Sequence, residues 1–68
     1  MRTQYLSTIG EKVRTRREEL SLSQIALAKR AGVHPNLVGR LERGEYNPTV
    51  LKIQAIANAL RVSLIDLL

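Results

Sequence analysis

Residues 22–44, LSQIALAKRAGVHPNLVGRLERG, decide the fold, because two short amphipathic segments lie there on either side of Gly32. Ser23 precedes the first segment, and its hydroxyl can accept a hydrogen bond from the free amides that open a helix. Gly32 follows that segment, where a helix ends and a left-handed backbone is favoured. A second helix is expected to begin near Pro35, whose fixed φ suits the first helical position, and to stop at Gly44. The stretch therefore predicts two helices joined by a tight turn.

Small and apolar residues determine how these two helices pack. Ala28 and Ala31 recur at helical spacing on the first helix and are small enough to let the second backbone approach closely. Val38 and Leu41 are three residues apart and form one inward stripe on the second helix. Helices packed in this way form a helix-turn-helix, the motif that places its second helix in the major groove of DNA.

The outer side of the second helix carries groups that can read base pairs. Asn36, Arg40 and Arg43 fall within an arc of ~60° at about 3.6 residues per turn. Asn can read adenine and Arg can read guanine, each with two hydrogen bonds along the major-groove edge. Gly39 is on the same side, where it is either a neutral surface position or a point of close approach to DNA.

The combined spacing resembles the Xre-like helix-turn-helix family of the Cro/lambda-repressor type, and the likeness extends over nearly the whole chain. The matching positions are Ile9-Gly10, Ser23-Gln24, Leu27-Ala28, Ala31-Gly32-Val33, Val38, Leu41-Glu42-Arg43-Gly44, Asn47-Pro48-Thr49, Ala59-Leu60 and Val62-Ser63. The resemblance implies an all-α fold. It would be a compact five-helix lambda-repressor-like DNA-binding domain with the helix-turn-helix at its second and third helices.

The resemblance also implies roles for individual residues. Gln24 is expected to touch a phosphate and to brace the recognition helix. The expected base-reading residues are His34, Pro35, Asn36 and Arg40. The expected phosphate-contacting residues are Gln24, Arg43, Tyr46 and Asn47. His34 stands where Ser or Thr more often caps the recognition helix, so both base readout and capping stay open for it.

One contact between distant parts of the chain is expected. Arg17 lies one helical turn past Val13, and Glu42 lies one turn past Val38, so both are beside an inward stripe. In the resembled family an Arg and a Glu at these positions form a buried ion pair. The expected role of an Arg17–Glu42 pair is to fix the orientation of the helices, because desolvation can cancel the Coulomb gain.

Length and composition limit the class of function. Sixty-eight residues allow one small domain. A formal charge of +5 favours an anionic partner, with nucleic acid first and anionic lipid second, and the alternative is a surface that is charged only for solubility. There is no Cys, and His34 has no clustered partner ligands, so we expect no metal and no cofactor. No catalytic constellation and no small-molecule ligand site is evident. Without a membrane-length apolar run or a signal-peptide region, the sequence predicts no membrane association and a cytoplasmic protein.

The N-terminal residues show no helical periodicity. Residues 1–7 are expected to form a flexible arm, followed by the DNA-binding domain over residues 8–68. Thr8 with Glu11 fits a capping box that would start the first helix. Glu45 replaces a position that is often basic in the resembled family, and its charge would repel a nearby phosphate.

The C-terminal part predicts two further helices. Thr49 is expected to cap the first, and Arg61 follows it where Gly or Asn is favoured, which predicts backbone strain. The expected inward residues of that helix are Val50, Ile53, Ile56, Ala57 and Leu60. Ser63 and Asp66 suggest a capping box for a final helix over residues 63–68.

The apolar residues of that final helix predict self-association. Leu64, Leu67 and Leu68 can fill a core-facing side, and Ile65 then points elsewhere, next to any part of Leu68 that the core leaves uncovered. A symmetric self-contact would cover such a patch. The expected dimer interface is Leu64, Ile65 and Leu68. The alternative is that these residues only complete the core of a monomer that pairs on DNA.

The sequence therefore predicts a regulator that binds a palindromic operator in double-stranded DNA as a homodimer, since one helix reads too few bases to select a site. The alternative is a protein-interaction module, such as an antitoxin that binds a partner toxin and regulates its own gene. Ile25, at a position that is usually polar in the resembled family, and the apolar C-terminal segment support that alternative. Enzymatic function is not expected.

Overall fold

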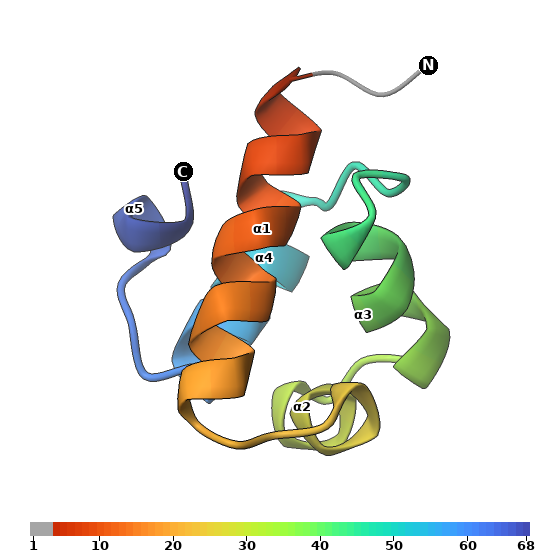
Figure 1. The fold of residues 1–68 in the computed structure, drawn as a ribbon, viewed down its shortest axis with the longest axis vertical. Coiled ribbons are helices and arrows are strands. Elements are labelled where there is room, and N and C mark those ends of the chain that lie inside the picture. Colours follow the sequence, from red (N-terminus) through yellow and green to blue (C-terminus); the bar gives the residue numbers. More distant parts are fainter. Residues whose placement is uncertain (1–3) are drawn as a thin grey trace.

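The structure, a computed structural model, describes residues 4–68 and contains five helices connected by short turns (Figure 1). In chain order these are α1 (Gln4–Glu19), α2 (Gln24–Ala31), α3 (Pro35–Glu42), α4 (Val50–Ala59) and α5 (Leu64–Leu67). In the view of Figure 1, α3 and α5 lie on opposite sides of α1, with α4 behind it and α2 below. The all-α five-helix fold predicted from the sequence is confirmed.

The first helix begins earlier than expected. α1 starts at Gln4, so residues 4–7 of the expected arm are helical, whereas residues 1–3 lie outside the described residues. The predicted start at Thr8 is wrong, because its hydroxyl donates to the carbonyl oxygen of Gln4 at 2.9 Å within the helix. Ser7, in the added turn, lies directly beside Gly44. Packing against the end of α3 thus stabilises a turn that has no start signal of its own.

The local signals at α2, the turn and α3 act as predicted. The hydroxyl of Ser23 accepts from the amide of Ala26 at 2.9 Å and caps α2. Gly32 has a φ of +72°, in the left-handed region that glycine adopts without steric cost. At the start of α3, Nδ1 of His34 accepts from the amide of Asn36 at 3.1 Å. The two helices are therefore fixed at both sides of a short, tightly closed turn.

One apolar core fills the space between the helices. The buried apolar residues of the described chain are Ile9, Val13, Leu27, Ala28, Val38, Leu41, Ile53, Ile56, Ala57, Ala59, Leu60 and Leu67. Val50 was predicted to point inward, and this is wrong, because it is 71% exposed. Side chains tilt toward the N-terminus of their helix, so that of Val50, the first residue of α4, extends past the packed layer.

The backbones of α1 and α3 are in direct contact at Gly10. A Cβ atom placed on Gly10 would lie 2.6 Å from the carbonyl oxygen of Glu42 and closer still to that of Leu41. No side chain larger than hydrogen fits between the two helices at this point. Gly10 therefore sets how closely α1 supports the C-terminal end of α3.

The chain turns back after α4 at Arg61, and Ser63 then caps the start of α5. Arg61 has a φ of +59°, which confirms the predicted strain at this position. The carboxylate of Asp66 accepts from both the hydroxyl and the amide of Ser63 at 2.9 Å. These two hydrogen bonds, of which the one from the hydroxyl has the larger effect, lower the pKa of Asp66 below its ordinary value. The pKa of Asp66 is thus lower in the folded than in the unfolded state. The cap therefore stabilises α5 fully at pH values above the unfolded-state pKa, and this stabilisation is lost as the pH falls through the folded-state pKa.

The part of the chain that the structure describes lacks both membrane-spanning and metal-binding features. No helix within residues 4–68 is long and apolar enough to cross a membrane. The same residues contain no group of three His, Cys, Asp or Glu side chains that could hold a metal ion.

Candidate nucleic-acid interface

The exposed side of α3 and the start of α2 form a shallow hollow. It has a volume of about 310 Å³ and is lined by Gln24, Pro35, Asn36, Gly39, Arg40 and Arg43. Apart from Gly39, every residue in this lining was expected from the sequence to contact DNA. The fold thus brings expected base-reading and phosphate-contacting residues of two helices onto one surface.

The first turn of α3 combines a fixed imidazole with a free amide. Because Nδ1 of His34 accepts a hydrogen bond, the neutral ring carries its proton on Nε2, which faces away from that bond. The capping role of His34 is confirmed, whereas its contact with bases stays a prediction. The exposed side chain of Asn36 has no hydrogen-bond partner within residues 4–68. Both its donor and its acceptor are available to the edge of a base.

A buried ion pair anchors the opposite side of α3. Nε and Nη2 of Arg17 donate to the two carboxylate oxygens of Glu42, at 2.6 and 3.0 Å. The two side chains are only 12% and 5% exposed. Nη1 of Arg17 also donates to the carbonyl oxygen of Leu22 at 2.9 Å, which ties the pair to the start of the α2 segment. The pKa of Arg17 is raised because Glu42 accepts its hydrogen bond, despite the opposing effect of burial.

Gln24 extends this anchor into the hollow. Its Nε2 donates to the Glu42 carboxylate at 3.1 Å, so the side chain braces α3 against α2. Gly39 is buried beneath the side chains of Gln24 and Arg43, which excludes a neutral surface position for it. A Cβ atom at Gly39 would lie 3.2 Å from Nη1 of Arg43. The missing side chain therefore lets these two residues lie across α3.

The loop after α3 positions Arg40 in a way that sequence reasoning missed. Its guanidinium carbon lies 5.6 Å from the ring centroid of Tyr46, within cation–π range. Tyr46 is itself half-buried and packed against the core, so it provides a rigid support. Asn47 follows as an exposed residue. Phosphate contacts by Tyr46 and Asn47 stay predictions.

Arg43 is engaged by an acid in the free protein. Its Nε lies 3.1 Å from Oε1 of Glu45, and the two side chains are 56% and 38% exposed. The sequence indicated that Glu45 would repel a phosphate, but not that it would hold the arginine expected to bind one. Because this pair is exposed to solvent, it is weak and can be exchanged for a phosphate contact.

The C-terminal helix carries a separate apolar surface. Ile65 is 77% exposed and Leu68 is 49% exposed, whereas Leu67 is fully buried. Leu68 was expected to fill the core-facing side, and its exposure shows that the core leaves about half of it uncovered. Leu64 is half-buried and packs against the core, so it is a smaller part of this surface than the sequence suggested.

Comparison with known proteins identifies the family. The helix-turn-helix family model matches residues 13–67. The immunity repressor protein of Bacillus phage phi105 is 33% identical over 55 residues, which make up 81% of this chain and 38% of that repressor. The chain thus spans well under half the length of this curated relative.

Solved structures agree in both fold and sequence. The restriction-modification controller protein C.AhdI from Aeromonas hydrophila has a TM-score of 0.90 and 33% identity, covering 93% of this chain and 96% of the controller. The c2 repressor of Salmonella phage P22, in complex with a synthetic operator, has a TM-score of 0.83 and 37% identity, covering 88% of this chain and 91% of the chain in that structure, whereas the match spans 26% of the whole repressor. These matches confirm a lambda-repressor-like fold. The chain belongs to the helix-turn-helix family of the Cro/lambda-repressor type, a family of DNA-binding transcriptional regulators rather than enzymes.

Proposed function

We propose that this domain binds a palindromic operator in double-stranded DNA as a homodimer and thereby regulates transcription in the cytoplasm. One observation carries the proposal: α3 exposes Asn36 and Arg40 on its outer side while its inner side is held by the buried Arg17–Glu42 pair. A reading helix must present its side chains in a fixed orientation, because bidentate contacts to a base edge require defined geometry. No cofactor is needed for this function.

We assign different residues of the hollow to base reading and to phosphate binding. Asn36 and Arg40 are assigned to base edges, with His34 and Pro35 making apolar or shape contacts. Gln24 and Arg43 flank them and are assigned to phosphates, which supply much of the affinity but little specificity. The repressor–operator complex of phage P22, whose fold this chain shares, supports the same direction of approach to DNA.

Replacing either base-reading residue by alanine is expected to weaken specific binding. Asn36→Ala and Arg40→Ala should each cost about 1–3 kcal/mol and relax the preference at one base pair per half-site. Fluorescence anisotropy with DNA that the wild-type protein selects, and with single-base-pair variants of it, measures both effects. Arg14→Ala removes an exposed arginine of α1 that is paired with Glu18 and serves as the control for charge. Unchanged base preference in both α3 variants would locate the readout elsewhere.

The salt dependence of binding is expected to report on Arg43. Affinity should fall steeply as salt rises, and Arg43→Ala should flatten the slope of log K against log salt by about one unit. Glu45→Gln should strengthen binding, because it removes a negative charge and frees Arg43 from its ion pair. Titrations over a series of salt concentrations measure each slope. An affinity that does not change with salt would be incompatible with DNA binding.

The homodimer rests on the exposed apolar surface of α5. α5, which contains Ile65 and is followed by Leu68, lies on the side of α1 opposite to α3 (Figure 1). A domain with extents of 28 × 23 × 21 Å, paired through this surface, can separate two recognition helices by one turn of DNA, roughly 34 Å. The self-contact would remove the apolar patch from water, which favours association.

Introducing a charge at this surface is expected to give monomers. Ile65→Glu would bury two carboxylates at a symmetric contact, so sedimentation at tens of micromolar should give a wild-type dimer and a monomeric variant. Leu51→Glu is the matched control, because Leu51 is 83% exposed on α4 and should leave the dimer intact. A monomeric wild-type protein over this range would contradict a constitutive dimer and leave only pairing on DNA.

A partner protein is the second candidate function. The specific observation is Ile25, which is 58% exposed at the start of α2. An exposed Ile next to the reading surface could be covered by a protein that competes with DNA, as the antitoxin alternative requires. Co-purification of the product of a neighbouring gene with the wild-type chain, but not with Ile25→Asp, would favour this function. The Ile25→Asp variant must lose the partner protein and still bind DNA with the affinity of the wild type.

A further inference from the structure

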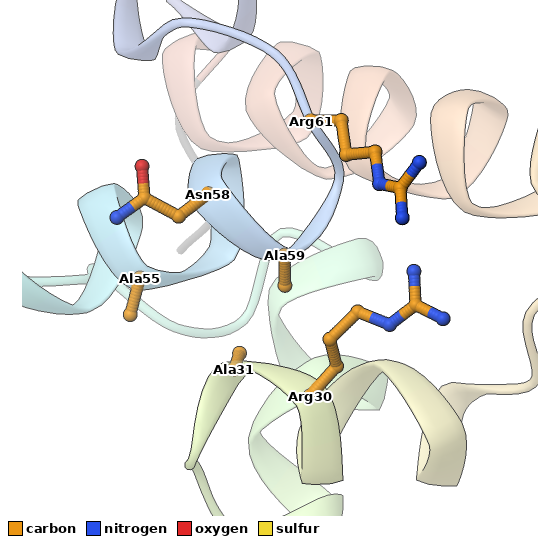
Figure 2. A pocket seen from close by; sticks show the side chains of 6 residues that line it. All are labelled: Arg30, Ala31, Ala55, Asn58, Ala59 and Arg61. Carbon is orange, nitrogen blue, oxygen red and sulfur yellow. The ribbon is translucent and has the colours of Figure 1, made fainter.

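A second hollow lies between α2 and the C-terminal end of α4 (Figure 2). It has a volume of about 580 Å³ and is lined by Arg30, Ala31, Ala55, Asn58, Ala59 and Arg61. The guanidinium groups of Arg30 and Arg61 face one another at one side of it (Figure 2). Ala31 and Ala59 lie in the middle of the view, and Ala55 and Asn58 lie on the side away from the guanidinium groups. The described lining contains no acidic residue. Two cations therefore converge on one open, partly apolar hollow.

Arg30 and Arg61 differ from the other arginines in residues 4–68, each of which has a partner. The partners are Glu18 for Arg14, the carbonyl of Leu60 for Arg16, Glu42 for Arg17, Tyr46 for Arg40 and Glu45 for Arg43. Within the described residues, Arg30 and Arg61 make no side-chain hydrogen bond or ion pair, and both are exposed. All the donors of both guanidinium groups are thus available at the same hollow.

The backbone of Arg61 determines where its side chain leaves the chain. Its φ of +59° lies in the left-handed region, which commonly ends a helix. The amide of Arg61 donates to the carbonyl oxygen of Asn58 at 3.1 Å, and that of Val62 donates to Ala57 at 3.1 Å, so this conformation closes α4. The exposed side chain of Arg61 therefore starts from the end of α4, at the side of the hollow.

We propose that this hollow is a binding site for a small phosphate-bearing molecule held between Arg30 and Arg61. A phosphoryl group has three acceptor oxygens in a non-planar arrangement and can accept from two guanidinium groups that approach from different directions. A carboxylate is planar, carries one charge and is satisfied by a single guanidinium. Two converging positive charges with no acidic residue in the lining attract an anion more strongly than either charge alone.

The site is separate from the DNA-binding surface. The two hollows share no lining residue. On α2, Arg30 is six residues from Gln24, which corresponds to about 9 Å along the axis and about 120° around it. A bound phosphate would connect α2 to the end of α4 and hold in place the helix that carries Gln24. The ligand is therefore a free small molecule rather than a phosphate of the DNA bound at α3.

Nuclear magnetic resonance titration of the whole chain with inorganic phosphate, and then with pyrophosphate, tests the proposal. Chloride at the same ionic strength is the reference. The Nε–H signals of Arg30 and Arg61 should shift and saturate with phosphate, whereas those of Arg14 should not. Arg30→Gln and Arg61→Asn should each weaken phosphate binding by about tenfold or more, since each removes a charge-assisted interaction. Asn tolerates the left-handed backbone, so Arg61→Asn keeps the fold.

The matched control is Lys29→Gln, which removes the same charge from the residue next to Arg30 but lies outside the hollow. It should change phosphate affinity by no more than about twofold, as expected for a screened surface charge. An equal loss in Lys29→Gln, or an absence of saturation in the wild type, would overturn the proposal. A second measurement is the affinity for selected DNA in chloride buffer. It should be unchanged in Arg30→Gln and Arg61→Asn, and a tenfold loss there would assign these arginines to DNA and overturn the small-molecule site.

Discussion

Glu42→Ala is expected to destabilise the domain by about 3 kcal/mol or more, a large share of the total stability of a small domain. The substitution leaves Arg17, 12% exposed, with a buried charge and no carboxylate to accept from Nε and Nη2. It also removes the acceptor of Gln24, which braces α3. Urea unfolding followed by circular dichroism measures the loss as a lower midpoint with an unchanged slope.

Two controls separate the buried pair from the loss of a surface charge. Glu18→Ala breaks the exposed pair with Arg14 and should change the free energy of unfolding by no more than about 0.5 kcal/mol. Replacing both Arg17 and Glu42 by fitted apolar residues should cost far less than Glu42→Ala alone, because no unpaired charge is then buried. If Glu42→Ala melts like the wild type, the two side chains do not meet in solution.

Gly10→Ala is expected to be the second strongly destabilising change. The new methyl group would overlap the carbonyl oxygens of Leu41 and Glu42, so α1 and α3 must move apart. Overpacking against backbone is at the upper end of such costs, about 3 kcal/mol, which leaves a net loss of about 2 kcal/mol once the gain of roughly 1 kcal/mol in helix propensity is subtracted. Chemical unfolding measures the loss.

Thr15→Ala is the control for Gly10→Ala, since it adds the same residue to an exposed position of α1. It should be neutral or slightly stabilising because only helix propensity changes. Gly10→Ala should also weaken DNA binding beyond its effect on stability, since the separation tilts α3. A Gly10→Ala variant as stable as Thr15→Ala would show that α1 and α3 do not approach as closely as described.

Local chemistry explains why much of the fold could be predicted from the sequence. The caps at Ser23 and Thr49 and the left-handed turn at Gly32 depend on residues within one helical turn, so residue type alone indicates them. The helix start at Gln4 could not be predicted in this way, because its first turn is stabilised by packing against Gly44. The outward position of Val50 follows from its place as the first residue of α4, which the apolar periodicity alone does not reveal.

The candidate site was predictable in its helical geometry but not in its polar contacts. The shared outer side of Asn36 and Arg40 follows from helical periodicity, and the contact between Arg17 and Glu42 followed from the family resemblance. By contrast, the ion pair of Arg43 with Glu45 depends on how the chain turns after α3. Such a turn brings together side chains that no periodic pattern relates.

The packing of Arg40 on Tyr46 has the same origin, since Tyr46 is fixed by its contact with the core. The hydrogen bond from Nε of Arg16 to the carbonyl oxygen of Leu60, at 3.0 Å, is also a long-range contact without a local signal. Local predictions were accurate at Ser23, Gly32 and Thr49 but wrong at Thr8 and Val50. Of the polar contacts between distant segments, the Arg17–Glu42 pair was predicted, and it came from the family resemblance rather than from a local signal.

The central claim is that α3 reads a palindromic sequence in duplex DNA, and selection of bound DNA from a random pool tests it most directly. Repeated rounds with the wild-type chain should enrich two inverted half-sites whose centres are separated by about 10–10.5 base pairs or a multiple of that. The same selection with Asn36→Ala should lose the preference at one position in each half-site. A pool that stays random after repeated rounds with the folded wild-type protein would contradict the claim.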